Sequence, residues 1–153
     1  MKNIMFICHG NICRSPSAEL LFNHIVKERH LEHRLHAVSS AVSSETIGRD
    51  GVGSPVYPQC RVLLEGEGID CSYKRSVQLK KEDYHKYDLL VLMDADNYRR
   101  AIHILGGDPE GKIKYLAEYI GGTEIADPWY TRDFEKALRD IRAAVVALID
   151  SIL

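Results

Sequence analysis

The chain has 153 residues, of which 45% are hydrophobic, and it carries a formal net charge of −2 with a pI near 6.4. A chain of this length predicts one globular domain over residues 1–153 that buries about two-thirds of its unfolded surface. The small negative charge argues against a nucleic acid or an anionic membrane as the partner, because both need a concentrated basic face. The apolar run after Asn3 is too short for a signal peptide, and no segment approaches the ~20 apolar residues of a membrane span, so a cytoplasmic protein is expected.

Apolar periodicity predicts strands and helices that alternate along the chain. Strands are predicted at 4–7, 35–39, 88–93 and 112–116, and helices at 15–29, 58–64, 80–86, 94–105 and 131–152. Ser15-Pro16 marks the start of the first helix, and Thr131 is the predicted cap of the last. A long segment rich in Ser and Gly, residues 40–57, joins the second strand to the second helix. Loops of this length in compact domains are usually functional or mobile.

The order of these elements predicts an α/β fold, in which helices cover both faces of a parallel sheet. In such sheets, ligands bind beyond the carboxyl ends of the strands, where the strand order switches. Cys8, Ser40 and Asp94 directly follow the first three predicted strands. We therefore expect these three residues to meet at one rim of the sheet.

The segment between the first strand and the first helix has the composition of a phosphate-binding loop that carries its own nucleophile. Gly10 and Asn11 tolerate unusual backbone angles, so the loop N–H groups and the positive end of the helix can converge on one oxyanion. The same field favours the thiolate form of Cys8, which is the nucleophilic form. Arg14 can grip two phosphate oxygens with its planar guanidinium, and Ser15 can donate a hydrogen bond to the sulfur. This phosphate-binding loop spans residues 8–15 and contains Cys8, His9, Gly10, Asn11, Ile12, Cys13, Arg14 and Ser15.

Two motifs carry a family resemblance. The run Cys8-His9-Gly10-Asn11-Ile12-Cys13-Arg14-Ser15-Pro16, together with Asp127-Pro128-Trp129-Tyr130, resembles the signature of the low-molecular-weight protein tyrosine phosphatases. The resemblance covers nearly the whole chain and implies a three-layer α/β/α fold with a four-stranded parallel sheet. It also implies a two-step reaction in which Cys8 forms a phosphocysteine, Arg14 stabilises the transferring phosphoryl group, and Asp127 is the general acid and then the general base. The implied substrate is a phosphotyrosine protein or peptide, or a small aryl phosphate, with inorganic phosphate as product and neither a metal nor another cofactor.

In the resembled family, a hydrogen-bond network holds the phosphate-binding loop rigid. The resemblance places Asn11, Ser15 and Ser40 in that network, whereas Lys74 or a neighbour stands where the family has a histidine. Asp94 matches a family aspartate at the rim, where it assists orientation. Its position directly before a helix is equally typical of an N-cap residue.

A phosphotyrosine pocket needs apolar or aromatic walls that hold the phenyl ring. Ile12, Trp129 and Tyr130 are the residues expected to line it. The family often places another aromatic residue in the 40–57 segment, but Glu45 stands there, and residues 49–54 look like an insertion. The substrate preference is therefore open at this point.

The four cysteines have neither the paired spacing of a zinc site nor the density of a secreted disulfide scaffold, so a reducing compartment is expected. Cys13 either captures oxidised Cys8 in a reversible disulfide, as the resemblance also suggests, or merely packs. Cys60 and Cys71 are expected to be small buried hydrophobic residues.

Three other functions are compatible with this kind of loop. Protein-arginine phosphatases have Thr where this chain has Ile12, and the bulkier Ile12 favours a phenyl ring. Thiol-dependent arsenate reductases need two further cysteines, a number that Cys60 and Cys71 supply, whereas Pro16 and the Asp-Pro-Trp-Tyr motif favour the phosphatase. A silent phosphotyrosine-binding module would lack the nucleophile or the general acid, and this chain has both.

Overall fold

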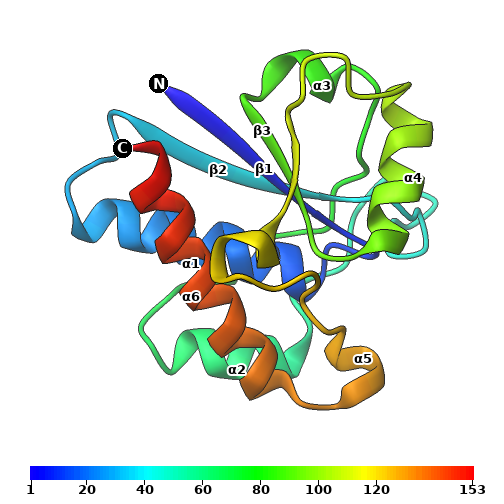
Figure 1. Ribbon diagram of the computed structural model, residues 1–153. Helices are drawn as coiled ribbons and strands as arrows, with labels where there is room; N and C mark the ends of the chain where they lie inside the picture. The colour runs from blue at the N-terminus through cyan, green and yellow to red at the C-terminus, as the bar shows by residue number, and fades with distance from the viewer.

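The computed structural model describes residues 1–153 as a four-stranded parallel sheet with helices on both faces (Figure 1). The strands are β1 (Lys2–Cys8), β2 (Leu35–Ala41), β3 (Leu89–Leu92) and β4 (Ile113–Tyr115). Their order in the sheet is β2-β1-β3-β4, and every neighbouring pair is parallel. The α/β fold with a four-stranded parallel sheet is thereby confirmed.

The helices form two layers. They are α1 (Arg14–Glu28), α2 (Pro58–Glu65), α3 (Asp83–Lys86), α4 (Ala95–Leu105), α5 (Pro128–Thr131) and α6 (Phe134–Ile152), and a 3-10 helix, η1 (Leu116–Ile120), follows β4. Figure 1 shows α1, α2 and α6 on one side of the sheet and α3 and α4 on the other. No helix combines the length and the apolar character needed to cross a membrane.

Strand β1 is the buried centre of the molecule because it pairs with both β2 and β3. Its side chains alternate between the two faces, as in any strand. Ile4 and Phe6 pack in the apolar cluster that includes α1 and α6, whereas Met5 and Ile7 pack in the cluster that includes α3 and α4. A strand buried on both faces reads as an unbroken apolar run, which is why this strand could be predicted.

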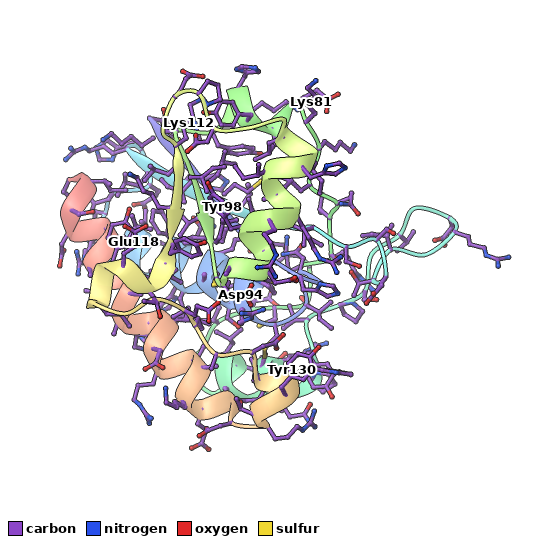
Figure 2. All side chains as sticks on the ribbon, turned by 45° about the vertical axis from the view of Figure 1, so that its right-hand side comes forward. Lys81, Asp94, Tyr98, Lys112, Glu118 and Tyr130 are labelled. Carbon is purple, nitrogen blue, oxygen red and sulfur yellow. A yellow bond between two sulfur atoms is a disulfide. The ribbon has the colours of Figure 1, made fainter.

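The strand order switches at the carboxyl end of β1, because β2 lies on one side of β1 and β3 on the other. The phosphate-binding loop joins β1 to α1 at this point, and Asp94 joins β3 to α4 beside it. Crevices at such switch points are where open parallel sheets bind ligands. Figure 2 shows Asp94 where α4 begins and Tyr130 on α5, on the same side of the molecule.

The C-terminal helix begins later than predicted, so the assignment of Thr131 as its cap is wrong. Asp133 is the N-cap of α6 and accepts a hydrogen bond from the Lys136 N–H at 3.0 Å. Thr131 instead ends α5, a short helix that the sequence analysis did not predict. Threonine and aspartate are both good capping residues, and they lie two positions apart here, so the pattern does not distinguish them.

The 40–57 segment leaves a shorter loop than predicted because β2 continues to Ala41. The middle of the loop folds back on itself, with a bridge between Ile47 and Gly53. A Cβ atom on Gly53 would lie 1.9 Å from the backbone oxygen of Ser76, so only glycine allows this close approach. Figure 2 shows this loop, in cyan, projecting from the body of the molecule.

Candidate active site

Cys8 is the last residue of β1 and is buried beneath the phosphate-binding loop. Its sulfur accepts a hydrogen bond from the backbone N–H of Asn11 at 3.3 Å. Asn11 has a φ of 55°, a left-handed conformation that asparagine tolerates better than most residues. The tight loop therefore aims a backbone donor at the sulfur.

A buried chain of hydrogen bonds fixes the proton directions behind the loop. The side-chain oxygen of Asn11 accepts from the Val77 N–H at 3.0 Å, which sets the orientation of the amide. The amide nitrogen then donates to Ser15 Oγ at 2.7 Å and to Ser39 Oγ at 2.8 Å. Ser15 is left with its own hydroxyl proton to donate to the Cys8 sulfur, 3.0 Å away.

The far end of this chain is a buried ion pair. Ser39 Oγ donates to Glu19 Oε1 at 2.7 Å, and Lys74 Nζ lies 3.1 Å from the same oxygen. Lys74 also donates to the backbone oxygen of Ser39 at 3.2 Å. The Lys74 and Glu19 side chains are only 8% and 7% exposed, so each charge depends on the other for compensation.

The placement of Ser40 in this network is wrong, and Ser39 occupies that place. Successive side chains of a strand point to opposite faces, so the choice between neighbours decides which face is reached. Ser39 faces Asn11 and Glu19, whereas Ser40 Oγ donates to Met5 Sδ at 3.2 Å. The prediction assumed that β2 ends before residue 40, but the strand continues to Ala41.

Arg14 lies between two carboxylates. Its Nη1 donates to Asp94 Oδ2 at 2.8 Å and to the backbone oxygen of Ile125 at 2.9 Å, and its Nη2 donates to Asp127 Oδ2 at 3.3 Å. Burial alone would lower the pKa of Arg14, but the negative charges of Cys8, Asp127 and Asp94 outweigh it and raise the pKa. The guanidinium therefore stays charged and is fixed in orientation beside the nucleophile.

Each of the two carboxylates has two functions in the structure. Asp94 is the N-cap of α4, where it accepts from the Asn97 N–H, and it also pairs with Arg14. Asp127 is the N-cap of α5, where its Oδ1 accepts from the Trp129 N–H at 3.0 Å. Its other oxygen, Oδ2, is left to face Arg14. The N-cap interpretation of Asp94 is thus confirmed, and the same residue also pairs with Arg14 at the rim of the sheet.

A cavity of about 730 Å³ opens above the phosphate-binding loop. The residues that the sequence analysis singled out and that line it are Cys8, His9, Gly10, Ile12, Cys13, Arg14, Glu45, Asp94, Asp127, Trp129 and Tyr130. One wall is aromatic: the ring of Tyr57 stacks on Phe134 with 5.6 Å between centroids and meets Trp129 edge-on at 5.7 Å. An anion-binding floor beside an aromatic wall suits a phosphate ester with a ring on its leaving group.

Comparisons with known proteins identify the family. The family described as low molecular weight phosphotyrosine protein phosphatase matches residues 3–153. This chain belongs to that family. Low molecular weight protein-tyrosine-phosphatase YfkJ of Bacillus subtilis (strain 168) is 31% identical over 155 residues, covering 99% of this chain and 96% of the relative. The low molecular weight phosphotyrosine protein phosphatase of Sus scrofa is 34% identical over 137 residues, which cover 86% of this chain and 82% of that relative.

Solved structures agree with this assignment. The crystal structure of YfkJ from Bacillus subtilis superimposes with a TM-score of 0.91 at 30% identity, covering 99% of this chain and 94% of that one. SP-PTP, a low molecular weight protein tyrosine phosphatase from Streptococcus pyogenes, gives a TM-score of 0.85 at 29% identity, covering 100% of this chain and 94% of that one. The protein is therefore a phosphomonoester hydrolase of this phosphatase family.

The hydroxyl groups of Thr46 and Ser76 support the phosphate-binding loop at Gly10. Thr46 Oγ1 donates to the backbone oxygen of Gly10 at 2.7 Å, and Ser76 Oγ donates to the same oxygen at 2.8 Å. Beside them, His9 Nε2 lies 3.2 Å from Glu45 Oε2 at the edge of the cavity. Glu45 therefore lines the cavity, at a position where the resembled family often has an aromatic residue.

The structure contains a disulfide that was not predicted. Cys13 is joined to Cys60, whereas Cys8 and Cys71 are free. Cys60 and Cys71 are both buried in the main core, as expected, but Cys60 is also bonded to Cys13. The sequence separation of 47 residues explains why this pairing was missed, because only the tertiary fold brings the start of α2 to the phosphate-binding loop.

Several site residues were missed by the sequence analysis. Glu19 follows Ser15 by one helical turn, so the helical period could have placed it on the same face of α1. Ser39, Ser76 and Tyr57 have no comparable local signal, because each reaches the loop through tertiary contacts with distant segments. No group of three or more His, Cys, Asp or Glu side chains is placed to hold a metal ion.

Proposed function

We propose that this enzyme hydrolyses phosphotyrosine through a phosphocysteine on Cys8. The observation that carries the proposal is the convergence of Cys8, Arg14 and Asp127 on one cavity that has an aromatic wall. The phosphoryl group would rest on the loop N–H groups, with its oxygens gripped by the Arg14 guanidinium. The phenyl ring would extend along the aromatic wall towards Trp129.

In the first step, the Cys8 thiolate attacks phosphorus and the bond from phosphorus to the phenolic oxygen breaks. Asp127 gives its proton to the departing phenolate, which becomes tyrosine. Ser15 and the Asn11 N–H hold the sulfur for attack. A positioned acid of this kind contributes roughly 100- to 10,000-fold to the rate.

In the second step, water attacks the phosphorus of the phosphocysteine, and the bond between sulfur and phosphorus breaks. The Asp127 carboxylate accepts a proton from the water as it attacks. Inorganic phosphate is released and the Cys8 thiolate is restored. Asp127 is about one-quarter exposed, so it can also exchange protons with solvent between the two steps.

Support for a phenyl leaving group comes from the cavity wall. Tyr57, Trp129 and Phe134 form a continuous aromatic surface, and Ile12 adds an apolar side chain beside the loop. A guanidinium leaving group, as in phosphoarginine, would instead gain most from carboxylates, and besides Asp94 and Asp127 the cavity offers Glu45 and Asp96 for that role. The aromatic surface includes Trp129, whose N–H donates to Asp127 Oδ1 at 3.0 Å, so a ring on that surface lies on the side of the proposed acid and phosphotyrosine is the better fit.

A side-by-side assay of phosphotyrosine, phosphoarginine and arsenate tests this assignment. We expect kcat/KM for a phosphotyrosine peptide to exceed that for a phosphoarginine peptide by at least about tenfold, and no thiol-dependent reduction of arsenate. A preference for phosphoarginine would contradict the substrate assignment while leaving the mechanism intact. Release of arsenite at a rate comparable to peptide dephosphorylation would favour the reductase instead.

A further inference from the structure

The disulfide between Cys13 and Cys60 includes a residue that lines the active-site cavity, yet it leaves the nucleophile free. Cys13 is the residue before Arg14 and lines the active-site cavity together with Cys8. Its Cα atom lies 5.9 Å from that of Cys60, an ordinary separation for a disulfide. Three cysteines, Cys8, Cys13 and Cys60, therefore form a series that leads from the cavity into the core.

The backbone holds Cys60 in reach of Cys13. The N–H of Tyr57, just before α2, donates to the backbone oxygen of Ile12 at 2.7 Å. This hydrogen bond joins the residue before Cys13 to the start of the helix that carries Cys60. Cys13 is the N-cap of α1 and Cys60 lies in the first turn of α2, where no acidic side chain is present. Both cysteines of the disulfide therefore lie at the N-terminal ends of helices that one backbone hydrogen bond holds together.

Access from solvent differs along the series. Cys8 and Cys60 are equally buried, at 4% exposed each, but Cys8 and Cys13 line the cavity whereas Cys60 does not. An oxidant that enters the cavity therefore meets Cys8 or Cys13 before it can reach Cys60. Oxidation that begins in the cavity would therefore reach Cys60 through Cys13.

We propose that Cys60 is a second resolving thiol, which moves oxidation of the active site away from Cys8 and returns the nucleophile to its reduced form. The proposal rests on the function proposed above for Cys8 as the reactive thiolate. The oxidant is hydrogen peroxide or another small hydroperoxide. The outcome is a phosphatase that stays active after oxidation, with the lost electrons taken from Cys13 and Cys60.

The chemistry balances in three steps. The Cys8 thiolate attacks one peroxide oxygen, the O–O bond breaks, and Cys8 sulfenic acid forms as hydroxide leaves and becomes water. The Cys13 thiolate attacks the Cys8 sulfur and expels a second hydroxide, which also becomes water, so that a Cys8–Cys13 disulfide forms. The Cys60 thiolate then attacks the Cys13 sulfur, the bond between Cys13 and Cys8 breaks, and the Cys8 thiolate leaves. In sum, peroxide and two thiols give two waters and the Cys13–Cys60 disulfide.

The last step, the attack of Cys60 on the Cys13 sulfur, favours release of Cys8. A disulfide opens most readily when the leaving sulfur is a well stabilised thiolate. Cys8 lies beside Arg14 and accepts hydrogen bonds from the Asn11 N–H and the Ser15 hydroxyl, so it is a favourable leaving group. An external dithiol that reduces Cys13–Cys60 would complete a cycle in which the protein consumes peroxide.

Cys71 provides a matched control for this relay. It lies in the same core cluster as Cys60 but is not bonded to another cysteine, and burial raises the pKa of its thiol to about 11. At neutral pH it is therefore almost entirely protonated and a poor nucleophile. Its sulfur hydrogen bonds to the backbone oxygen of Ile69 instead of to another cysteine.

The test treats fully reduced protein with a small excess of hydrogen peroxide, alkylates the remaining thiols, maps the disulfides by mass spectrometry and measures phosphatase activity. Wild type and Cys71→Ser should map to Cys13–Cys60, with Cys8 alkylated and most of the activity kept. Cys60→Ser should map to Cys8–Cys13 and lose at least about tenfold in activity, which dithiothreitol restores. Cys13→Ser should lose activity that dithiothreitol does not restore, because the sulfenic acid progresses to higher oxidation states.

The disulfide map and the residual activity of the wild-type protein are enough to overturn the proposal. If the stable product in wild type is Cys8–Cys13, or if wild type is inactivated as strongly as Cys60→Ser, then Cys60 does not resolve the oxidised nucleophile. Cys60→Ala serves as a second variant where serine disturbs the core. Failure of the proposed function would look different, because the reduced wild type would then show no turnover of phosphotyrosine before any peroxide is added.

Discussion

Behind the phosphate-binding loop the polar side chains are buried and paired, whereas the cavity wall in front of it is largely exposed. Asn11, Ser15 and Ser39 form one directed chain of hydrogen bonds that ends on the Glu19–Lys74 pair. In front, Trp129 is 57% exposed and Tyr130 is 82% exposed. The comparison indicates that the reacting atoms are held by a rigid support, while the leaving group meets a wall that can adjust. Changes behind the loop should therefore act on kcat, and changes in front should act on KM.

Arg14 stands between the two regions, and Arg14→Lys should have the largest effect among the variants that keep the nucleophile. An ammonium cannot reproduce the two-pronged contact with phosphate or keep both Asp94 and Asp127 in place. We expect kcat/KM for a phosphotyrosine peptide to fall about 1,000-fold, with kcat and phosphate binding both affected. Steady-state kinetics and inhibition by inorganic phosphate measure the two parts. Activity within a few-fold of wild type would mean that another residue grips the phosphoryl group.

Asp127→Asn should come next, with a loss that depends on the leaving group. The amide cannot donate a carboxylic proton, so phenyl phosphate should lose about 100-fold in kcat/KM, which reports the step in which the phenol departs. p-Nitrophenyl phosphate should lose much less, because its phenolate departs without a proton. A plot of rate against leaving-group basicity measures this difference. Equal losses for both esters would show that Asp127 is not the acid, and Asp94 would then be the residue to test.

The buried ion pair tests the rigid support directly. Lys74→Met leaves the Glu19 carboxylate uncompensated, and we expect the free energy of unfolding to fall by about 3–5 kcal/mol. Loosening of the loop should lower kcat about tenfold and leave KM nearly unchanged. Denaturant unfolding and steady-state kinetics measure the two effects.

Two further variants separate charge compensation from a general loss of packing. The double variant Lys74→Met with Glu19→Gln should regain most of the lost stability, because no buried charge remains. Lys136→Met removes an exposed pair with Asp140, whose atoms are 2.7 Å apart, and should change stability by less than about 1 kcal/mol. A double variant no more stable than Lys74→Met alone would contradict the compensation argument.

Substitutions in the aromatic wall of the cavity should have the smallest effect on kcat/KM. Trp129→Ala removes the edge contact with Tyr57 and part of the aromatic surface. We expect KM for aryl phosphates to rise roughly three- to tenfold, with little change in inhibition by inorganic phosphate. Tyr130→Ala, at a more exposed position, is the control and should change KM less. A fall in kcat without a change in KM would place Trp129 with the rigid support instead.

The part of the site that could be predicted is the part built from neighbouring residues. The phosphate-binding loop lies between an apolar strand and a helix within one short segment, so its backbone donors, Cys8 and Arg14 all follow from local sequence. The fold class follows from the alternation of elements, because a strand–helix order leaves few topologies.

The residues that were misplaced depend on register or on distant segments. Ser39 and Ser40 differ by one position, and only the observed end of β2 shows which one faces Asn11. The Cys13–Cys60 disulfide and the reach of Lys74 to Glu19 require that separate segments meet, which the hydrophobic pattern does not encode. The pairing of Lys74 is also hard to predict because its side chain is long and flexible, and a lysine can pair with any carboxylate within its reach.

Rapid-quench labelling tests the central claim most directly. Wild type is mixed with a phosphotyrosine peptide that carries a radiolabelled phosphoryl group, quenched within a single turnover, and digested for peptide mapping. We expect the label on Cys8 as phosphocysteine, at a level that rises before free phosphate appears, and no label on Cys8→Ser under the same conditions. Label on a histidine or an aspartate, or full activity in Cys8→Ser, would contradict the mechanism.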